Sequence, residues 1–307
     1  MKIANKYAQD FTQDERMTYI GGSDIAAIMG KSRWCTPLKM WAYKTGRLPA
    51  PDFSQNERVK FGKKLEWIVA EEYAERNNVK VQNRKEAYTH PKYPFLKAHV
   101  DRIVLNADKI LEAKTCGAEK GKEWANSNVP VEYVLQSNWN AGLAKRKQFA
   151  IAVLIGGNHY EEVTLDFDKE LFDEQVNIAI NFWKEYVIKN VMPPVSADDS
   201  NAILEIYPNH CEDMIENQEI EERISYLKEI ENYYKEQGAE IETIKNELKA
   251  LIGDKQGIIT NKYRVTWKEI TKEIPDSEKL KADGIFENYS KISSYRQLKV
   301  NKRKDAA

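Results

Sequence analysis

The chain has 307 residues, enough for one sizeable core with an appendage or for two modest domains. Its 47 basic and 48 acidic residues nearly cancel, which excludes the strong overall positive field of many nucleic-acid-binding proteins. Any contact with nucleic acid must come from a local basic groove, and no apolar run is long enough to span a membrane.

The cysteines favour a reducing compartment. Cys35, Cys116 and Cys211 are far apart and form no Cys-x-x-Cys pair. They cannot supply the four thiolates of a typical iron–sulfur cluster. Because no secretory leader precedes them, we expect a reduced, cytoplasmic protein.

A glycine turn near the start of the chain is a candidate anion site. Gly21-Gly22 breaks an initial polar helix, and Ser23 is a candidate N-cap for a helix over 24–29. Such a turn offers backbone amides to an anion, and the side chains of Arg16 and Ser23 can add donors. An ordinary capped helix explains the same residues, so this pattern alone leaves both interpretations open.

Two further helices are expected before the first strands. Thr36 and Pro37 are typical of a helix start, and Gly46 of its end. Apolar spacing predicts another helix over 57–76, in which Glu66 lies beside the buried stripe. Glu66 is either a surface carboxylate or an acid directed from this helix into the site of the hairpin that follows.

A β-hairpin is the central prediction. Runs of strand-forming residues at 99–105 and 109–114 flank residues 106–108, whose composition is turn-prone. A strand over 80–89 is expected to lead into this hairpin. The segment around it organises the rest of the chain, because it carries the residues with the clearest chemistry.

Those residues are Asp101, Glu112 and Lys114. Side chains alternate across a strand, so Glu112 and Lys114 share one face, and two carboxylates converge with an ammonium group if Asp101 faces the same side. Two neighbouring carboxylates can bind a hard cation such as Mg²⁺ and leave water sites for a phosphate and a nucleophile. A lysine beside them can orient that water or stabilise charge on phosphorus. This is the chemistry of phosphodiester hydrolysis.

Solvated hairpin charges are the alternative. A chain with 31% charged residues also produces such a pattern by chance, and Glu247-Leu248-Lys249 repeats the Glu-x-Lys triplet inside a predicted helix. The strand context of Glu112 is what favours the metal site.

The second half of this domain is predicted to complete a sheet. A helix over 131–145 places Gln136 and Asn140 one turn apart, either as surface groups or facing the metal site. Strands follow at 148–155 and 160–167, and then a long helix begins at Asp168. We expect an α/β (α+β) domain over 1–195, with a central mixed β-sheet flanked by helices.

Residues 196–307 are predicted to form a C-terminal extension. Apolar residues recur at three-, four- and seven-residue steps over 212–252, which predicts a helix or a helical hairpin with Gly238 as a candidate break. A small β element is expected over 258–300. The extension packs on its own core or on a sister subunit, or it docks a partner protein.

Several motifs occur in a single order along the chain. After Arg16 they are IGGSDIAAIMG, TPLKMWAYKTG, FGKKLE, HVDRIV with LEAK, and VPVEYVLQ with AVLIGG. Together they resemble the YqaJ-type viral recombinase nucleases, a group that includes lambda exonuclease within the PD-(D/E)xK nuclease superfamily. The resemblance covers about residues 10–190 and implies a PD-(D/E)xK core.

The resemblance assigns catalytic roles. It implies that Asp101 and Glu112 hold a divalent metal, Mg²⁺ or Mn²⁺, and that Lys114 is the catalytic lysine. Glu66 matches the family's helix carboxylate, which assists at the metal site. Gln136 matches the glutamine that closes the active-site motif.

It also implies a phosphate pocket. Arg16 and Ser23 fall where lambda exonuclease presents an arginine and a serine to the 5′-phosphate of the DNA end. A third serine of that pocket is replaced here by His99, which can also donate to phosphate. Val100 precedes Asp101 where the superfamily name expects proline.

The implied function is a metal-dependent deoxyribonuclease that degrades double-stranded DNA ends from 5′ to 3′. Its 3′ single-stranded overhangs would serve phage-type annealing recombination in a bacterial host. A homo-oligomer, a trimer in lambda exonuclease, and an annealing partner of the RecT or Beta type are also implied. The alternatives are a RecB-like nuclease of other end preference and a non-catalytic DNA-binding or assembly module.

Overall fold

The computed structural model describes residues 13–209, 212–214 and 216–292. Its contacts divide the chain into two compact units, with the boundary between Pro208 and Asn209. The first unit is longer than the predicted domain of residues 1–195, because α7 (Ser200–Ile206) packs on α3 (Pro37–Lys44) and buries Ala202.

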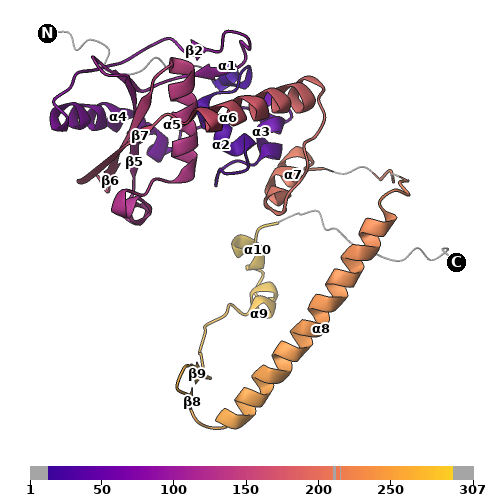
Figure 1. Ribbon diagram of the computed structural model, residues 1–307. Helices are drawn as coiled ribbons and strands as arrows, with labels where there is room; N and C mark the ends of the chain where they lie inside the picture. The colour runs from indigo at the N-terminus through magenta and orange to yellow at the C-terminus, as the bar shows by residue number, and fades with distance from the viewer. Residues whose placement is uncertain (1–12, 210–211, 215, 293–307) are drawn as a thin grey trace. The chain divides into compact units, whose positions relative to one another are not determined.

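A five-stranded mixed sheet forms the centre of the first unit (Figure 1). Its two long central strands run parallel, and all other neighbours are antiparallel. This confirms the predicted mixed α/β architecture. The strand order is β1 (Val81–Gln82), β4 (Arg102–Val104), β5 (Lys109–Cys116), β6 (Gln148–Ile155) and β7 (His159–Asp166).

The predicted central hairpin is the β4–β5 pair, in which Arg102 lies opposite Leu111. Asn106 adopts a left-handed conformation in the turn (φ 60°). The strand expected over 80–89 is instead two short strands in different sheets, because β1 joins the main sheet while β2 (Tyr88–Thr89) pairs with β3 (Lys97–Ala98).

Helices cover both faces of the sheet (Figure 1). On one face, Leu111 and Ala113 of β5 pack in a core cluster with residues of α4 (Glu57–Arg76). On the other face, Ile110 packs in a cluster with residues of α5 (Val131–Ala144), the helix that connects β5 to β6. The alternation of β5 therefore directs Glu112 and Lys114 toward the α5 side.

A further layer of helices packs around α5. Trp41 and Trp139 are fully buried within it. Gly22 permits a close approach, since a Cβ there would lie 2.4 Å from Asn140 Oδ1 on α5. The remaining elements of the unit are α1 (Gln13–Met17), α2 (Gly22–Ile28), the 3₁₀ helices Lys120–Ser127 and Ala197–Asp199, α6 (Lys169–Asn181) and a π-helical segment (Phe182–Ile188).

The second unit contains one long helix, α8 (Glu221–Ile252), that Gly238 does not break. After it, the predicted β element is limited to a hairpin of β8 (Gly257–Ile259) and β9 (Arg264–Thr266). Short helices α9 (Ser277–Ala282) and α10 (Phe286–Tyr289) replace strand structure beyond it, and residues 293–300 lie outside the described residues.

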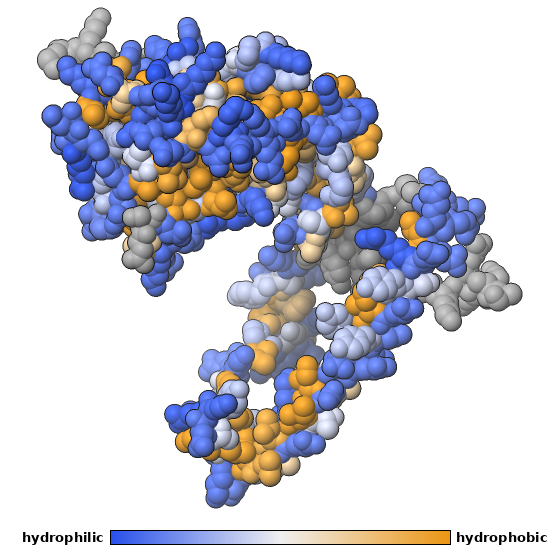
Figure 2. Space-filling model, in the orientation of Figure 1, coloured by the Kyte–Doolittle hydropathy of each residue, from blue (hydrophilic) through white to orange (hydrophobic). Residues whose placement is uncertain are grey.

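Apolar side chains remain on the surface of this unit. Ile241 is 53% exposed and Leu251 is 74% exposed. Figure 2 shows hydrophobic residues on the surface of α8 and of the β8–β9 hairpin. In the part of the chain that the structure describes, no helix is long and apolar enough to cross a membrane.

Candidate active site

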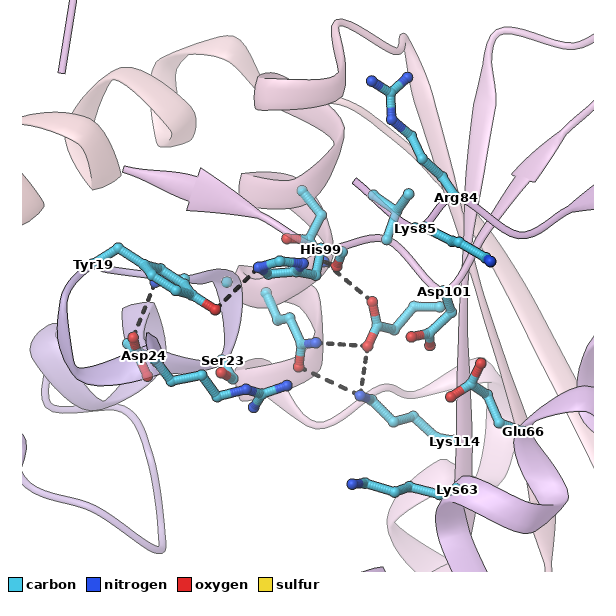
Figure 3. A pocket seen from close by; sticks show the side chains of 17 residues that line it. Tyr19, Ser23, Asp24, Lys63, Glu66, Arg84, Lys85, His99, Asp101 and Lys114 are labelled. Atoms are coloured by element: carbon cyan, nitrogen blue, oxygen red, sulfur yellow. Dashed lines mark hydrogen bonds and ion pairs between the residues drawn. The ribbon is translucent and has the colours of Figure 1, made fainter. Parts of the chain in front are cut away.

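One pocket of about 420 Å³ in the first unit is lined by all the site residues that the sequence predicts (Figure 3). They come from the N-terminal segment, α4, the β4–β5 hairpin and α5. The folded chain thus collects residues that are far apart in the sequence. They are Arg16, Ser23, Glu66, His99, Asp101, Glu112, Lys114 and Gln136.

Asp101 and Glu112 are brought together by the hairpin. Asp101 lies directly before β4, and its Oδ2 accepts a hydrogen bond from the backbone amide of Ala113 on β5 (2.8 Å). This bond holds the Asp101 carboxylate beside the strand that carries Glu112. The Glu112 side chain is almost completely buried, at 2% exposed.

Four hydrogen bonds donated by side chains fix the position of Glu112 and its surroundings. From α5, Gln136 Nε2 donates to Glu112 Oε1 (2.6 Å) and Asn140 Nδ2 donates to Glu112 Oε2 (3.2 Å). Asn140 also donates to the carbonyl oxygen of His99 (3.1 Å). From the same strand, Lys114 Nζ donates to Glu112 Oε1 (2.6 Å). The carboxylate orientation is therefore fixed in advance.

The electrostatics of the pocket favour a bound cation. Burial and the nearby charge of Asp101 raise the pKa of Glu112 to about 7. Burial disfavours the charged form of Lys114, but the carboxylates of Glu112 and Asp101 outweigh it and raise the pKa of Lys114. Lys114 therefore stays protonated at neutral pH. The neighbouring carboxylates of Asp101 and Glu112 repel each other, so a bound cation would stabilise their ionised forms.

Glu66 reaches the pocket from α4 and is held by Arg102. Arg102 donates to Glu66 Oε1 (2.7 Å) and to the carbonyl oxygen of Asp101 (2.6 Å). Burial, followed by the charge of Asp101, raises the pKa of Glu66. Figure 3 shows the side chains of Glu66, Asp101 and Lys114 pointing toward a common space.

The carboxylates fit a divalent metal that keeps part of its water. Among the described residues, no group of three or more His, Cys, Asp or Glu side chains could hold a metal by itself. Mg²⁺ does not require one, because it is usually bound by one or two carboxylates, several waters and substrate phosphates. Asp101 and Glu112 offer such a set.

The N-terminal corner of the pocket, formed by Arg16, Tyr19 and residues 21–24, differs from the sequence prediction. Gly21, rather than Ser23, is the N-cap of α2, and Ser23 lies within the helix. The amide of Gly21 donates to Asp24 Oδ2 (2.9 Å), which removes it as a donor to an anion. The side chains of Arg16 and Ser23 still line the pocket.

His99 is a neutral group in this corner. Burial, with the charges of Arg16 and Lys97, lowers the pKa of His99 to about 4. Its Nε2 lies 3.0 Å from the hydroxyl of Tyr19. His99 can therefore offer hydrogen bonds but no positive charge to a ligand at neutral pH.

Sequence comparison identifies the family. The YqaJ-like viral recombinase domain matches residues 13–147. The protein YqaJ of Bacillus subtilis (strain 168), described as uncharacterized, is 32% identical over 296 residues, which cover 93% of this chain and 92% of that protein. The chain belongs to the YqaJ-like viral recombinase family. This confirms the resemblance drawn from the ordered motifs.

Structure comparison matches this chain to solved structures that include two exonucleases. The alkaline exonuclease LHK-Exo of Laribacter hongkongensis has a TM-score of 0.49 and 16% identity, covering 57% of this chain and 91% of that chain. The phage-related exonuclease of Haemophilus somnus 129PT has a TM-score of 0.44 and 14% identity, covering 58% of this chain and 99% of that chain.

In this family member, a buried lysine that sequence reasoning missed supports the N-terminal corner. Lys44 Nζ donates to the carbonyl oxygens of Arg16 (2.7 Å) and Tyr19 (2.6 Å), and it pairs with Asp24 Oδ2 (2.8 Å). It thereby fixes the backbone that carries Arg16. The signal was available, because Lys44 lies three residues after Trp41 on the buried stripe of α3.

Basic residues at the pocket edge were also missed. Lys63 lies on α4, one turn before Glu66, and Arg84 and Lys85 lie in the loop between β1 and β2. Figure 3 shows Lys63 and Lys85 on opposite sides of Glu66, whereas the Arg84 side chain points away from the carboxylates. The sequence assigned residues 80–89 to a strand, which hid the loop that brings Arg84 and Lys85 to the site.

Proposed function

We propose that this YqaJ family member is a divalent-metal-dependent deoxyribonuclease that degrades one strand of double-stranded DNA from its 5′ end. The observation that carries the proposal is the convergence of Asp101, Glu112 and Lys114 in one pocket, with Glu112 buried and held by three side-chain donors. A buried carboxylate without a ligand or substrate to bind costs stability, which argues against a purely structural role.

Asp101 and Glu112 would hold the metal, Mg²⁺ or Mn²⁺, and Glu66 would assist. When bound, the metal supplies Lewis-acid stabilisation of the phosphoryl group and lowers the pKa of a coordinated water. The raised pKa of Glu66, caused by burial and Asp101, suits it to share a proton with water near the site.

Lys114 acts through its charge. Because its pKa is raised by the carboxylates of Glu112 and Asp101, it does not serve as the general base. It hydrogen-bonds the nucleophilic water and stabilises the negative charge that develops on the phosphate oxygens. Gln136 supports it, since its Oε1 accepts a weak hydrogen bond from Lys114 Nζ (3.4 Å) while its Nε2 holds Glu112.

Arg16 and Ser23 would bind the terminal 5′-phosphate. A guanidinium group pairs well with phosphate oxygens, and the hydroxyl adds a neutral donor. His99, uncharged at neutral pH, adds a hydrogen bond. An anchored 5′-phosphate in the same pocket as the carboxylates supports digestion from 5′ to 3′, which leaves a 3′ single-stranded overhang.

Membership of a viral recombinase family supports a proposal for the biological setting. We propose that the overhang is passed to a single-strand annealing protein of the RecT or Beta type. We also propose that the chain works as a homo-oligomer, for which a trimer is the first expectation. Recombination by strand annealing needs such an overhang, which supports the assignment of this polarity.

The test uses linear duplex DNA labelled at either the 5′ or the 3′ end, with a 5′-phosphate or a 5′-hydroxyl. We expect early release of the 5′ label, only with Mg²⁺ or Mn²⁺, and faster with the 5′-phosphate. Asp101→Asn should abolish release, and Arg16→Gln should remove the preference for the 5′-phosphate. Early release of the 3′ label would overturn the polarity, and intact DNA under all conditions would overturn the nuclease assignment.

A further inference from the structure

An exposed tryptophan on the first unit has two cations close to its ring. Trp34, in the loop between α2 and α3, is 58% exposed. The guanidinium carbon of Arg33 lies 5.4 Å from its ring centroid, and Lys120 Nζ lies 5.7 Å from it. An indole this exposed contributes little to the core, and its ring is accessible to a ligand.

Trp34 is connected to the candidate active site through one aromatic residue. Its ring centroid lies 6.2 Å from that of Tyr133, and the Tyr133 centroid lies 5.2 Å from Lys114 Nζ. Behind Tyr133, the buried Trp124 stacks at 5.5 Å and fixes the ring. An aromatic series thus runs from the lysine of the pocket to the protein surface.

The two cations near Trp34 differ in their partners. Arg33 pairs with Glu123 (2.8 Å) and with Glu132 (2.8 Å), so its charge is compensated and its side chain is held beside the indole. Lys120 supplies a cation next to the ring. The indole also borders a hollow of about 410 Å³, which leaves room for a flat ligand.

We propose that Trp34 is a stacking platform for a base of single-stranded DNA near the strand that is cleaved. The inference rests on the proposed nuclease function and adds a binding site to it. Aromatic side chains stack on any base, and neighbouring cations follow the phosphate backbone, so the platform accepts all sequences. It would hold unpaired nucleotides at the outer end of this aromatic series, without a preference for any base.

The test measures binding rather than cleavage. Fluorescence anisotropy of a labelled oligothymidine is recorded in EDTA for the wild type, Trp34→Ala, Trp34→Leu and Trp34→Phe. We expect Trp34→Ala and Trp34→Leu to weaken binding by about 5- to 150-fold, the effect of losing one base–aromatic stack. Trp34→Phe should retain most of the affinity. Trp34→Leu separates stacking from apolar bulk.

Two controls make the result decisive. Trp267→Ala removes an indole that is 50% exposed in the second unit and should leave binding unchanged. Trp34→Ala should weaken binding by the same factor at every salt concentration, whereas Lys120→Ala should reduce the slope of affinity against salt.

Wild-type affinity retained by both Trp34→Ala and Trp34→Leu would overturn the platform, as would absence of oligothymidine binding by the wild type. The proposed function fails separately: Trp34-dependent binding without any metal-dependent digestion of duplex DNA would reject the nuclease and keep the binding site.

Discussion

The same Glu-x-Lys triplet occurs in two regions of this molecule with opposite outcomes. In β5, Glu112 and Lys114 lie on one face, 2.6 Å apart, and Glu112 is buried. In α8, residues two positions apart do not face each other, and Lys249 Nζ instead donates to Asn246 Oδ1 (3.0 Å). The triplet becomes a candidate site only where a strand aligns its charges and a fold buries them.

The two units differ in the same way. Ile151 of β6 is fully buried between neighbouring strands, whereas Ile241 of α8 is 53% exposed. In the first unit, apolar residues form a core that positions polar side chains around a pocket. In the second unit, the apolar residues of α8 lie largely on the surface.

The largest difference should appear in stability. Ile151→Ala leaves a cavity in a packed core and should lower the free energy of unfolding by roughly 2–5 kcal/mol. Ile241→Ala removes an exposed side chain and should change it by less than about 0.5 kcal/mol. Chemical denaturation followed by circular dichroism measures both variants. A large effect of Ile241→Ala would contradict the contrast, because it would show that this side chain is covered in solution.

Replacing two helical glycines by alanine should change the free energy of unfolding by smaller amounts and in opposite directions. A Cβ at Gly142 of α5 would lie 2.3 Å from the ring of Phe172, so Gly142→Ala should destabilise the first unit by roughly 1–3 kcal/mol. Nothing lies within 4 Å of a Cβ at Gly238 of α8, so Gly238→Ala should stabilise that helix by up to about 1 kcal/mol. Thermal unfolding of both variants checks the pair, and equal signs would contradict it.

The last effect concerns pH. Burial and Asp101 raise the pKa of Glu112 to about 7. In the metal-free protein, the free energy of unfolding should therefore fall as the pH rises from the pKa of Glu112 in the unfolded chain toward 7, because the buried carboxyl group must then ionise. A bound metal needs the ionised form. The apparent affinity for Mg²⁺ should therefore increase by about tenfold per pH unit below 7 and level off above it. Titration with Mg²⁺ at a series of pH values measures this, and a flat dependence would contradict it.

Much of the first unit follows from the sequence. Strand alternation placed Glu112 and Lys114 on one side, and helix periodicity placed Gln136 and Asn140 together, because both depend on local geometry. The mixed sheet followed from the same patterns. The catalytic roles of these residues stay predictions.

Other features depend on contacts between distant segments. The bond from Arg102 to Glu66 and the burial of Lys44 arise only when α3, α4 and the hairpin are packed together. The loop carrying Arg84 was hidden because residues 80–89 have strand-like composition, although β1 and β2 join different sheets. Gly238 did not end α8, since strong helix formers surround it and outweigh its cost of about 1 kcal/mol.

The most direct measurement compares the two triplets in one assay. Linear duplex DNA is incubated with Mg²⁺ and the wild type, Lys114→Ala or Lys249→Ala. We predict that the wild type and Lys249→Ala digest the DNA at equal rates, while Lys114→Ala loses about 10²-fold or more of the activity, the scale expected for removing a charged donor at the reacting phosphate. Equal digestion by all three proteins would contradict the assignment of the pocket as the active site.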